Sequence, residues 1–108
     1  MTVRAAWVMT LKPGNEAIYK TKHDEIWPEM LANMKRDGVV SFSIYRYSLK
    51  LFAYIERDSE PEPNRKPEDI TWRWWEMMAP YMDTNPDFSP VMEPVEEMFH
   101  VDRSGALA

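Results

Sequence analysis

Residues 39–56 read Val-Val-Ser-Phe-Ser-Ile-Tyr-Arg-Tyr-Ser-Leu-Lys-Leu-Phe-Ala-Tyr-Ile-Glu, and this stretch decides the fold. Its two parts, residues 39–47 and 51–56, are rich in β-branched and aromatic residues, which favour strands. Only about three residues separate the two parts, a spacing that predicts an antiparallel hairpin. The rest of the fold is worked out from this hairpin towards both ends of the chain.

A strand and a helix are predicted before the hairpin. Residues 3–11 alternate between two faces with a period of two, which indicates a strand. Residues 15–37 carry apolar side chains at helical spacing, which predicts one helix. Pro28 interrupts its hydrogen-bond ladder, so we expect a kink near Trp27. Gly38 is the expected C-terminal stop of this helix.

The segment after the hairpin predicts a loop, a helix and a last strand. Residues 57–66 contain no apolar side chain apart from prolines, so we expect a mobile surface loop. Pro67 opens a second helix, and residues 83–90 form a turn-rich connection. Residues 95–101 are predicted as a short fourth strand, and residues 103–108 as a flexible C-terminal tail.

The predicted order β-α-β-β-α-β indicates a ferredoxin-like α+β fold in a single domain over residues 1–102. Its antiparallel four-stranded sheet has helices on one face. We expect the other face to carry apolar residues that are unsuited to contact with water, such as Trp7, Phe42, Tyr45 and Phe52. A second copy of the chain is the natural cover, which gives a homodimer with a dimeric α+β barrel.

The composition excludes several classes of protein. The chain has 108 residues, a net charge of −5, no Cys and two His, so disulfides and thiolate metal sites are excluded and few ligands remain for zinc. The acidic balance argues against a protein that binds nucleic acid. No apolar run approaches the ~20 residues of a membrane span, and the first residues lack the apolar stretch of a signal peptide. We therefore expect a cytoplasmic protein without a membrane partner.

Tyr19 and His23 are the first candidate site residues. They are four residues apart, so both project from the same face of the predicted helix. Histidine is the side chain best suited to acid–base chemistry near pH 7, and the phenol of Tyr19 can orient it or hold a ligand hydroxyl. The alternative is an exposed helical histidine beside a half-buried tyrosine. His100 falls in the predicted fourth strand, where a structural role is expected.

Trp74 and Trp75 are the second candidates. Adjacent residues on a helix diverge by ~100°, so the two indoles cannot both face the same core. One can pack inward while the other lines a cavity, where its ring binds the C–H face of a sugar and its N–H donates to a hydroxyl. The alternative is packing in the core and at an interface.

Four blocks of this sequence resemble the L-rhamnose mutarotase family. In the order and spacing of that family they are Tyr19-x-x-x-His23-Asp24-Glu25-Ile26-Trp27-Pro28-Glu29, Arg73-Trp74-Trp75, Thr84-Asn85-Pro86-Asp87-x-Ser89-Pro90-Val91, and Met98-Phe99-His100. The resemblance covers residues 3–102. The block around His23 and the block at Asn85-Pro86-Asp87 are the most specific to the family.

The resemblance implies a cytoplasmic, homodimeric isomerase that interconverts the α and β anomers of L-rhamnose without a metal ion or an organic cofactor. It implies that His23 is the acid/base residue, that Tyr19 binds the sugar, and that Trp74 and Trp75 contact it. Where the family often has a substrate-contacting tyrosine, this chain has Phe42. The corresponding hydroxyl contact is therefore lost or is supplied by another group.

Two other functions stay open at this point, since a fold does not define a function. One is a non-catalytic sugar-binding protein. The other is an oxygenase or haem-binding relative with the same dimeric barrel, in which a histidine with aromatic neighbours would be a ligand. The sugar itself could also be another 6-deoxy sugar related to L-rhamnose.

Overall fold

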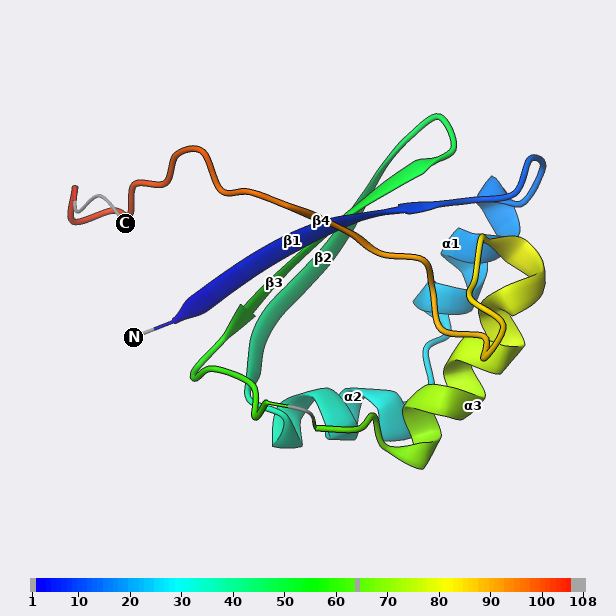
Figure 1. Ribbon diagram of the computed structural model, residues 1–108, viewed down its shortest axis with the longest axis horizontal. Coiled ribbons are helices and arrows are strands. Elements are labelled where there is room, and N and C mark those ends of the chain that lie inside the picture. Colours follow the sequence, from blue (N-terminus) through cyan, green and yellow to red (C-terminus); the bar gives the residue numbers. More distant parts are fainter. Residues whose placement is uncertain (1, 64, 106–108) are drawn as a thin grey trace.

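A four-stranded antiparallel sheet carries helices along one face (Figure 1). The computed structural model describes residues 2–63 and 65–105. In the order β2-β3-β1-β4 across the sheet, the strands are β2 (Val39–Tyr47), β3 (Lys50–Arg57), β1 (Val3–Thr10) and β4 (Glu93–Val95). The helices are α1 (Glu16–Asp24), α2 (Pro28–Arg36) and α3 (Asp69–Met78), and a 3₁₀ turn, η1 (Ala79–Tyr81), follows α3. The ferredoxin-like order predicted from the sequence is confirmed.

The predicted hairpin is present and is tighter than expected. β2 and β3 pair in antiparallel register, with Phe42 opposite Ile55. Only Ser48 and Leu49 connect the strands, and Ser48 has a positive φ of 55°. The guanidinium of Arg46 donates a hydrogen bond to the carbonyl of Ser48 at 3.0 Å, which ties the turn to β2.

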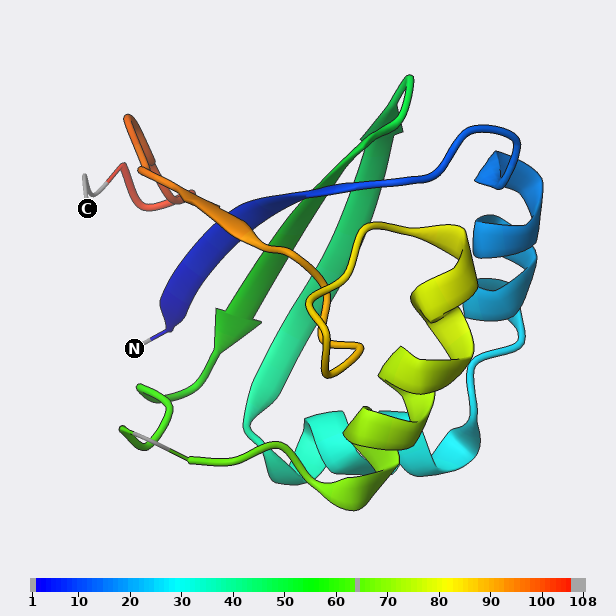
Figure 2. The same ribbon diagram turned by 45° about the vertical axis from the view of Figure 1, so that its right-hand side comes forward.

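The expected kinked helix over residues 15–37 is in fact two helices. Trp27 lies between α1 and α2 with an extended backbone, φ −63° and ψ 135°. The ring of Pro28 clashes with a helical conformation in the residue before it, so the helix ends rather than bends. Pro28 then begins α2, a position in which its missing N–H costs nothing. The break lets α1 and α2 run in different directions (Figure 2).

Gly38 ends α2, as the sequence predicts. Its φ is +80°, and its N–H donates to the carbonyl of Lys35 at 3.2 Å. A β-carbon at Gly38 would lie 2.5 Å from Oδ1 of Asp58. The same glycine therefore stops the helix and allows the chain after β3 to pass closely.

One expectation about the faces of the sheet is wrong. Trp7 and Phe42 lie on the helix-covered face, where they pack against the core with their ring centroids 5.9 Å apart. Tyr45 and Phe52 do lie on the open face and are 67% and 43% exposed. Phe42 and Tyr45 are three residues apart on β2, so alternation already puts them on opposite faces, and the expectation that both lie on the open face overlooked this. Alternation does not say which of the two faces the helices cover.

The predicted fourth strand over residues 95–101 is also largely wrong. β4 covers Glu93–Val95, and residues 96–100 form no strand. Met98 and Phe99 are 84% and 74% exposed, on a segment that runs away from the helices (Figure 1). A strand needs a hydrogen-bonded neighbour, and alternating apolar residues alone do not supply one. His100 accordingly lies outside any strand.

The core lies between the sheet and the helices. The largest of its fully buried side chains are Leu11, Leu51 and Met78. Within the part of the chain that the structure describes, no helix is both long and apolar enough to cross a membrane. The tail predicted over residues 103–108 lies partly outside the described residues, so its flexibility stays a prediction, as does the mobility of the 57–66 loop.

Candidate active site

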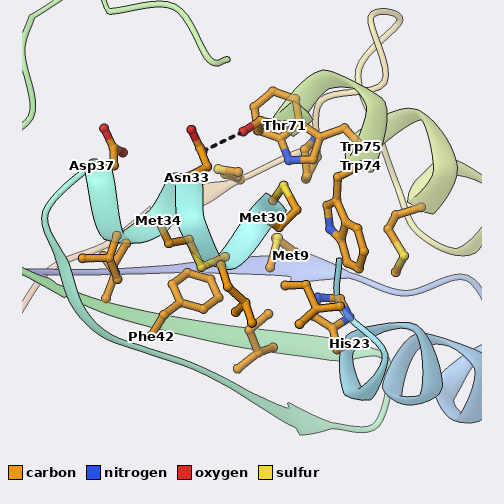
Figure 3. A pocket seen from close by; sticks show the side chains of 18 of the residues that line it. Met9, His23, Met30, Asn33, Met34, Asp37, Phe42, Thr71, Trp74 and Trp75 are labelled. Carbon is orange, nitrogen blue, oxygen red and sulfur yellow. Dashed lines mark hydrogen bonds between the residues drawn. The ribbon is translucent and has the colours of Figure 1, made fainter. Parts of the chain in front are cut away.

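A cavity of about 470 Å³ lies between the sheet and the three helices (Figure 3). Small-molecule sites typically measure about 300–1,000 Å³, so this volume suits a monosaccharide. Its wall is mostly apolar. Six of the nine methionines of the chain contribute to it, namely Met9, Met30, Met34, Met78, Met82 and Met92. Methionine side chains are flexible, so such a wall can adapt to a ligand that changes shape.

All five site residues predicted from the sequence line this cavity: Tyr19 and His23 from α1, Phe42 from β2, and Trp74 and Trp75 from α3. A smaller hollow of about 260 Å³ is also bordered by the first three but by neither tryptophan. The larger cavity is therefore where these five side chains meet. What each of them does there stays a prediction.

His23 is held in one tautomer by the backbone of its own helix. Its Nδ1 lies 3.0 Å from the carbonyl oxygen of Tyr19. A carbonyl can only accept, so Nδ1 carries the proton, and in the neutral ring Nε2 has a free lone pair. Burial lowers the pKa of His23 below its ordinary value, although the Tyr19 carbonyl and Asp24 act in the opposite direction. The imidazole is thus neutral near pH 7 and able to accept a proton.

Aromatic rings fix the imidazole from two sides. The ring of Tyr19 stacks on that of His23 with centroids 4.3 Å apart. Trp74 meets the imidazole edge-on at 5.3 Å, and Trp27 supports Trp74 in the same way at 5.1 Å. Offset and edge-to-face pairs of this kind are favourable beyond the surface that they bury. The contacts of His23 therefore restrain its ring in orientation as well as in tautomer.

Tyr19 keeps its hydroxyl proton. The residue is only 7% exposed, and burial raises the pKa of its phenol. A neutral phenol both donates and accepts hydrogen bonds, which suits it to a sugar hydroxyl.

Trp74 and Trp75 diverge as their adjacent positions predict. Trp74 is 6% exposed and belongs to the core, whereas Trp75 is half-buried and packs edge-on against Trp72 at 5.0 Å. Both nevertheless border the cavity. Trp74 thus combines the two alternatives considered for this pair, because it packs in the core and also lines the cavity.

The far side of the cavity is polar, and the sequence did not indicate it. Asn33 and Asp37 on α2, Arg57 at the end of β3 and Thr71 on α3 line this side. Asn33 Nδ2 donates to Thr71 Oγ1 at 3.3 Å. In Figure 3 Asn33 and Asp37 lie across the cavity from His23, with methionines between. The signal that could have indicated this polar side is Asn33, a polar residue next to the apolar positions of its predicted helix.

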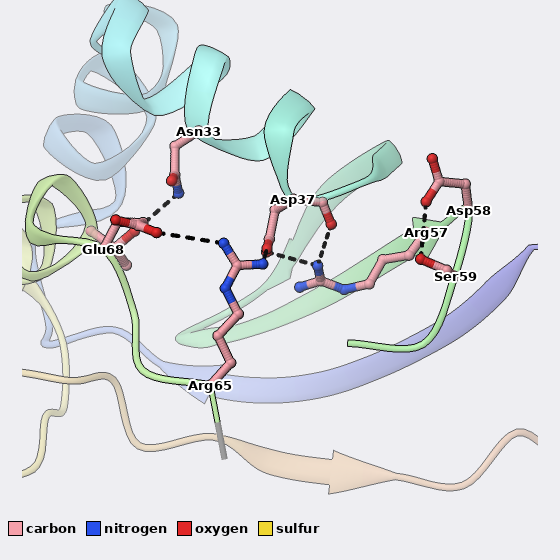
Figure 4. Close-up of polar contacts among 8 residues, drawn as sticks. Asn33, Asp37, Arg57, Asp58, Ser59, Arg65 and Glu68 are labelled. Carbon is pink, nitrogen blue, oxygen red and sulfur yellow. Dashed lines mark hydrogen bonds and ion pairs between the residues drawn. The ribbon is translucent and has the colours of Figure 1, made fainter. Parts of the chain in front are cut away.

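An ion-pair cluster borders this polar side (Figure 4). The carboxylate of Asp37 binds Arg57 at 2.8 Å through one oxygen and Arg65 through the other. Arg65 also lies 3.5 Å from Glu68. Because Arg65 belongs to the connection between β3 and α3, the cluster ties that connection to the end of α2.

Other charged candidates lie elsewhere. Glu29, the last residue of the block around His23, is exposed and lies 3.8 Å from Arg73. His100 lies 3.9 Å from Glu97, and neither of them borders the cavity. Among the described residues, no group of three or more His, Asp or Glu side chains could hold a metal ion.

Comparisons with known proteins identify the family. The family model for L-rhamnose mutarotase matches residues 4–101. The L-rhamnose mutarotase of Bacillus subtilis is 42% identical, and the alignment covers 92% of this chain and 98% of that protein. The L-rhamnose mutarotase of Oceanobacillus iheyensis is 39% identical, again over 92% of this chain and 98% of the relative.

A solved structure agrees with both sequence comparisons. The crystal structure of an L-rhamnose mutarotase from Formosa agariphila superposes with a TM-score of 0.82 at 35% identity, and it covers 93% of this chain and 99% of that chain. The similarity therefore extends over the sheet and the helices. The chain belongs to the L-rhamnose mutarotase family.

Proposed function

We propose that this protein interconverts the α and β anomers of L-rhamnose, with His23 as the acid/base residue. The observation that carries the proposal is the position of His23 at the cavity together with its tautomer and its lowered pKa. It borders the cavity, its Nδ1 donates to the Tyr19 carbonyl at 3.0 Å, and burial lowers its pKa. A neutral imidazole with Nε2 free is the form that can accept a proton from the anomeric hydroxyl.

Mutarotation then requires one proton to move between two oxygens of the sugar. Nε2 of His23 removes the proton of the anomeric hydroxyl, the bond between C1 and the ring oxygen breaks, and C1 becomes an aldehyde. The resulting imidazolium returns the proton to the former ring oxygen, which leaves a neutral open chain. After rotation about the C1–C2 bond, the same steps in reverse close the ring on the other face of C1. The hydrogen bond from Nδ1 to the Tyr19 carbonyl stabilises the transient imidazolium.

The remaining predicted residues have binding roles. The phenol of Tyr19 holds a sugar hydroxyl near His23, and the rings of Trp74 and Trp75 stack on the deoxy face and the methyl group. Phe42 adds apolar contact where it borders the cavity. The methionine-rich wall accommodates the open chain while it rotates.

Saturation-transfer NMR on L-rhamnose tests this activity, because it measures exchange between the two anomeric protons directly. Addition of the protein is expected to raise the exchange rate above that in buffer, and more so for L-rhamnose than for L-mannose, which has a hydroxyl on C6. Binding without faster exchange would instead make the protein a sugar-binding module. Faster exchange of L-mannose than of L-rhamnose would contradict the proposed substrate.

We also propose that a second copy of the chain covers the open face of the sheet. Tyr45, Phe52 and Val95 are 67%, 43% and 49% exposed there, and Met98 and Phe99 are exposed on the segment beyond β4. An apolar face of this kind is typical of an interface. Sedimentation equilibrium should give twice the mass of one chain. A stable species of 12.8 kDa at micromolar concentration would contradict the homodimer.

The cytoplasmic location expected from the sequence stays a prediction. Fractionation of cells that express a tagged form of the protein measures it directly. Recovery with the cytoplasmic fraction is expected, and recovery from the periplasm or the medium would contradict it.

A further inference from the structure

Two residues that line the cavity each carry a buried polar atom without a hydrogen-bond partner. Among the residues that the structure describes, Nε1 of Trp7 and Oδ1 of Asn33 are the buried side-chain nitrogen and oxygen atoms without one. Both residues line the cavity that contains His23. One atom is a donor and the other is an acceptor.

Such unpaired groups need an explanation, since nearly all buried polar atoms in folded proteins are hydrogen-bonded. Neither atom is in contact with solvent, inside the cavity or outside it, so a ligand hydroxyl reaches either atom only when the neighbouring side chains move. A buried donor or acceptor left unpaired weakens folding, so a site that keeps two of them in one cavity wall is built for a ligand that pairs with them.

The surroundings of Asn33 leave its amide free to turn. Its Nδ2 bond to Thr71 Oγ1 is 3.3 Å long, beyond the usual range for an N–H···O bond. The terminal torsion of an asparagine is also soft. A small rotation therefore brings the amide to a hydroxyl in the cavity, and a hydroxyl can pair with either of its polar atoms.

The surroundings of Trp7 are apolar. Its ring meets that of Phe42 at 5.9 Å and packs against the core. Phe42 has no hydrogen-bonding group, so the indole N–H of Trp7 is the donor that this part of the wall can offer to a ligand.

We propose that Trp7 Nε1 and Asn33 Oδ1 form hydrogen bonds with hydroxyl groups of the sugar and so determine which sugar the cavity accepts. The inference rests on the proposed function, because it assigns these contacts to the same substrate at the same site. Trp7 donates to one hydroxyl and Asn33 accepts from one. They act in binding, and the proton transfer at His23 does not involve them.

The test compares Trp7→Phe and Asn33→Leu with the unchanged protein. Trp7→Phe removes the indole N–H, and Asn33→Leu removes both polar atoms of the amide, including the Nδ2 donor to Thr71 Oγ1. Both variants keep most of the side-chain volume. Each is expected to weaken L-rhamnose binding by about two- to tenfold, the effect of one hydrogen bond, with kcat little changed. The melting temperature of Trp7→Phe should stay close to that of the unchanged protein, because its indole N–H has no partner to lose. Asn33→Leu should lower the melting temperature slightly, because it also removes the long hydrogen bond to Thr71. Trp72→Phe, which changes a tryptophan outside the cavity, is the matched control and should leave KM unchanged.

Deoxy sugars make the test independent of how well the variants fold. L-Rhamnose analogues that lack the 2-, 3- or 4-hydroxyl are titrated calorimetrically against all the proteins. For the analogue that lacks the paired hydroxyl, the unchanged protein should already bind about two- to tenfold more weakly, and the variant should cause no further loss.

Unchanged affinity for L-rhamnose in both variants would overturn the inference. So would a loss of affinity that is equal for L-rhamnose and for every deoxy analogue, because that result indicates a change in shape rather than a lost hydrogen bond. Since calorimetry measures binding alone, these results are separate from a failure of the proposed function, in which the unchanged protein binds L-rhamnose but does not accelerate anomer exchange.

Discussion

The two sides of the cavity differ in how their polar groups are satisfied. On the α1 side, the imidazole of His23 is held by a backbone carbonyl and by the rings of Tyr19 and Trp74. On the α2 side, the amide of Asn33 has one long hydrogen bond and one unpaired oxygen. A restrained group suits a proton transfer that needs fixed geometry, whereas an unpaired group suits recognition.

The largest effect is expected from removal of the Trp74 ring, which packs against His23 on the α1 side of the cavity. Trp74→Ala deletes a buried side chain and its contacts with His23 and Trp27, which should lower the free energy of unfolding by about 3–5 kcal/mol. Trp75→Ala, the matched variant at the half-buried neighbour, should cost clearly less. Urea denaturation followed by circular dichroism measures both. Equal losses would contradict the different packing of the two indoles.

The second largest effect is expected from removal of the His23 imidazole. His23→Ala should lower kcat for anomer exchange by about 100-fold or more, equivalent to about 2.7 kcal/mol of barrier, with a smaller effect on KM. Tyr19→Phe should cost less, because the ring that stacks on His23 is retained. His100→Ala changes the other histidine of the chain, outside the cavity, and serves as the control. If His23→Ala kept near-normal exchange, the proton transfer would have to be assigned to another group.

The smallest effect is expected where a hydroxyl is added. Phe42→Tyr introduces a phenol at the cavity wall, where one new hydrogen bond to the sugar is worth about 0.5–1.5 kcal/mol. KM should therefore fall by about two- to tenfold with little change in stability. A large drop in the melting temperature would instead show that Phe42 packs too tightly to admit an oxygen.

The α1 side could be predicted from the sequence, because its residues lie at fixed spacings on single helices. Tyr19 and His23 are one helical turn apart, and Trp74 and Trp75 are adjacent, so local geometry brings each pair to the cavity. The family resemblance supplied their roles. The first strand followed from residues that alternate along the chain, and the hairpin from two strand-favouring segments with a short connection.

The polar side of the cavity and the extent of the fourth strand depend instead on contacts between segments that are distant in the sequence. Asn33 pairs with Thr71, which is 38 residues away, and no local pattern links the two. The assignment of Trp7 to the open face was wrong because alternation does not show which face the helices cover. The assignment of Phe42 was wrong because Phe42 and Tyr45, three residues apart on β2, cannot share a face. The fourth strand was predicted too long because residues 96–100 have no paired neighbour to complete a ladder.

The pH dependence of anomer exchange, measured beside the NMR titration of the His23 imidazole, tests the central claim most directly. Burial lowers the pKa of His23 below its ordinary value of 6.5, and the protonated ring cannot accept the anomeric proton. kcat/KM should therefore fall as the pH is lowered through a pKa below 6.5, and the imidazole should titrate at that same pH. An exchange rate that is independent of pH where His23 titrates would contradict the account.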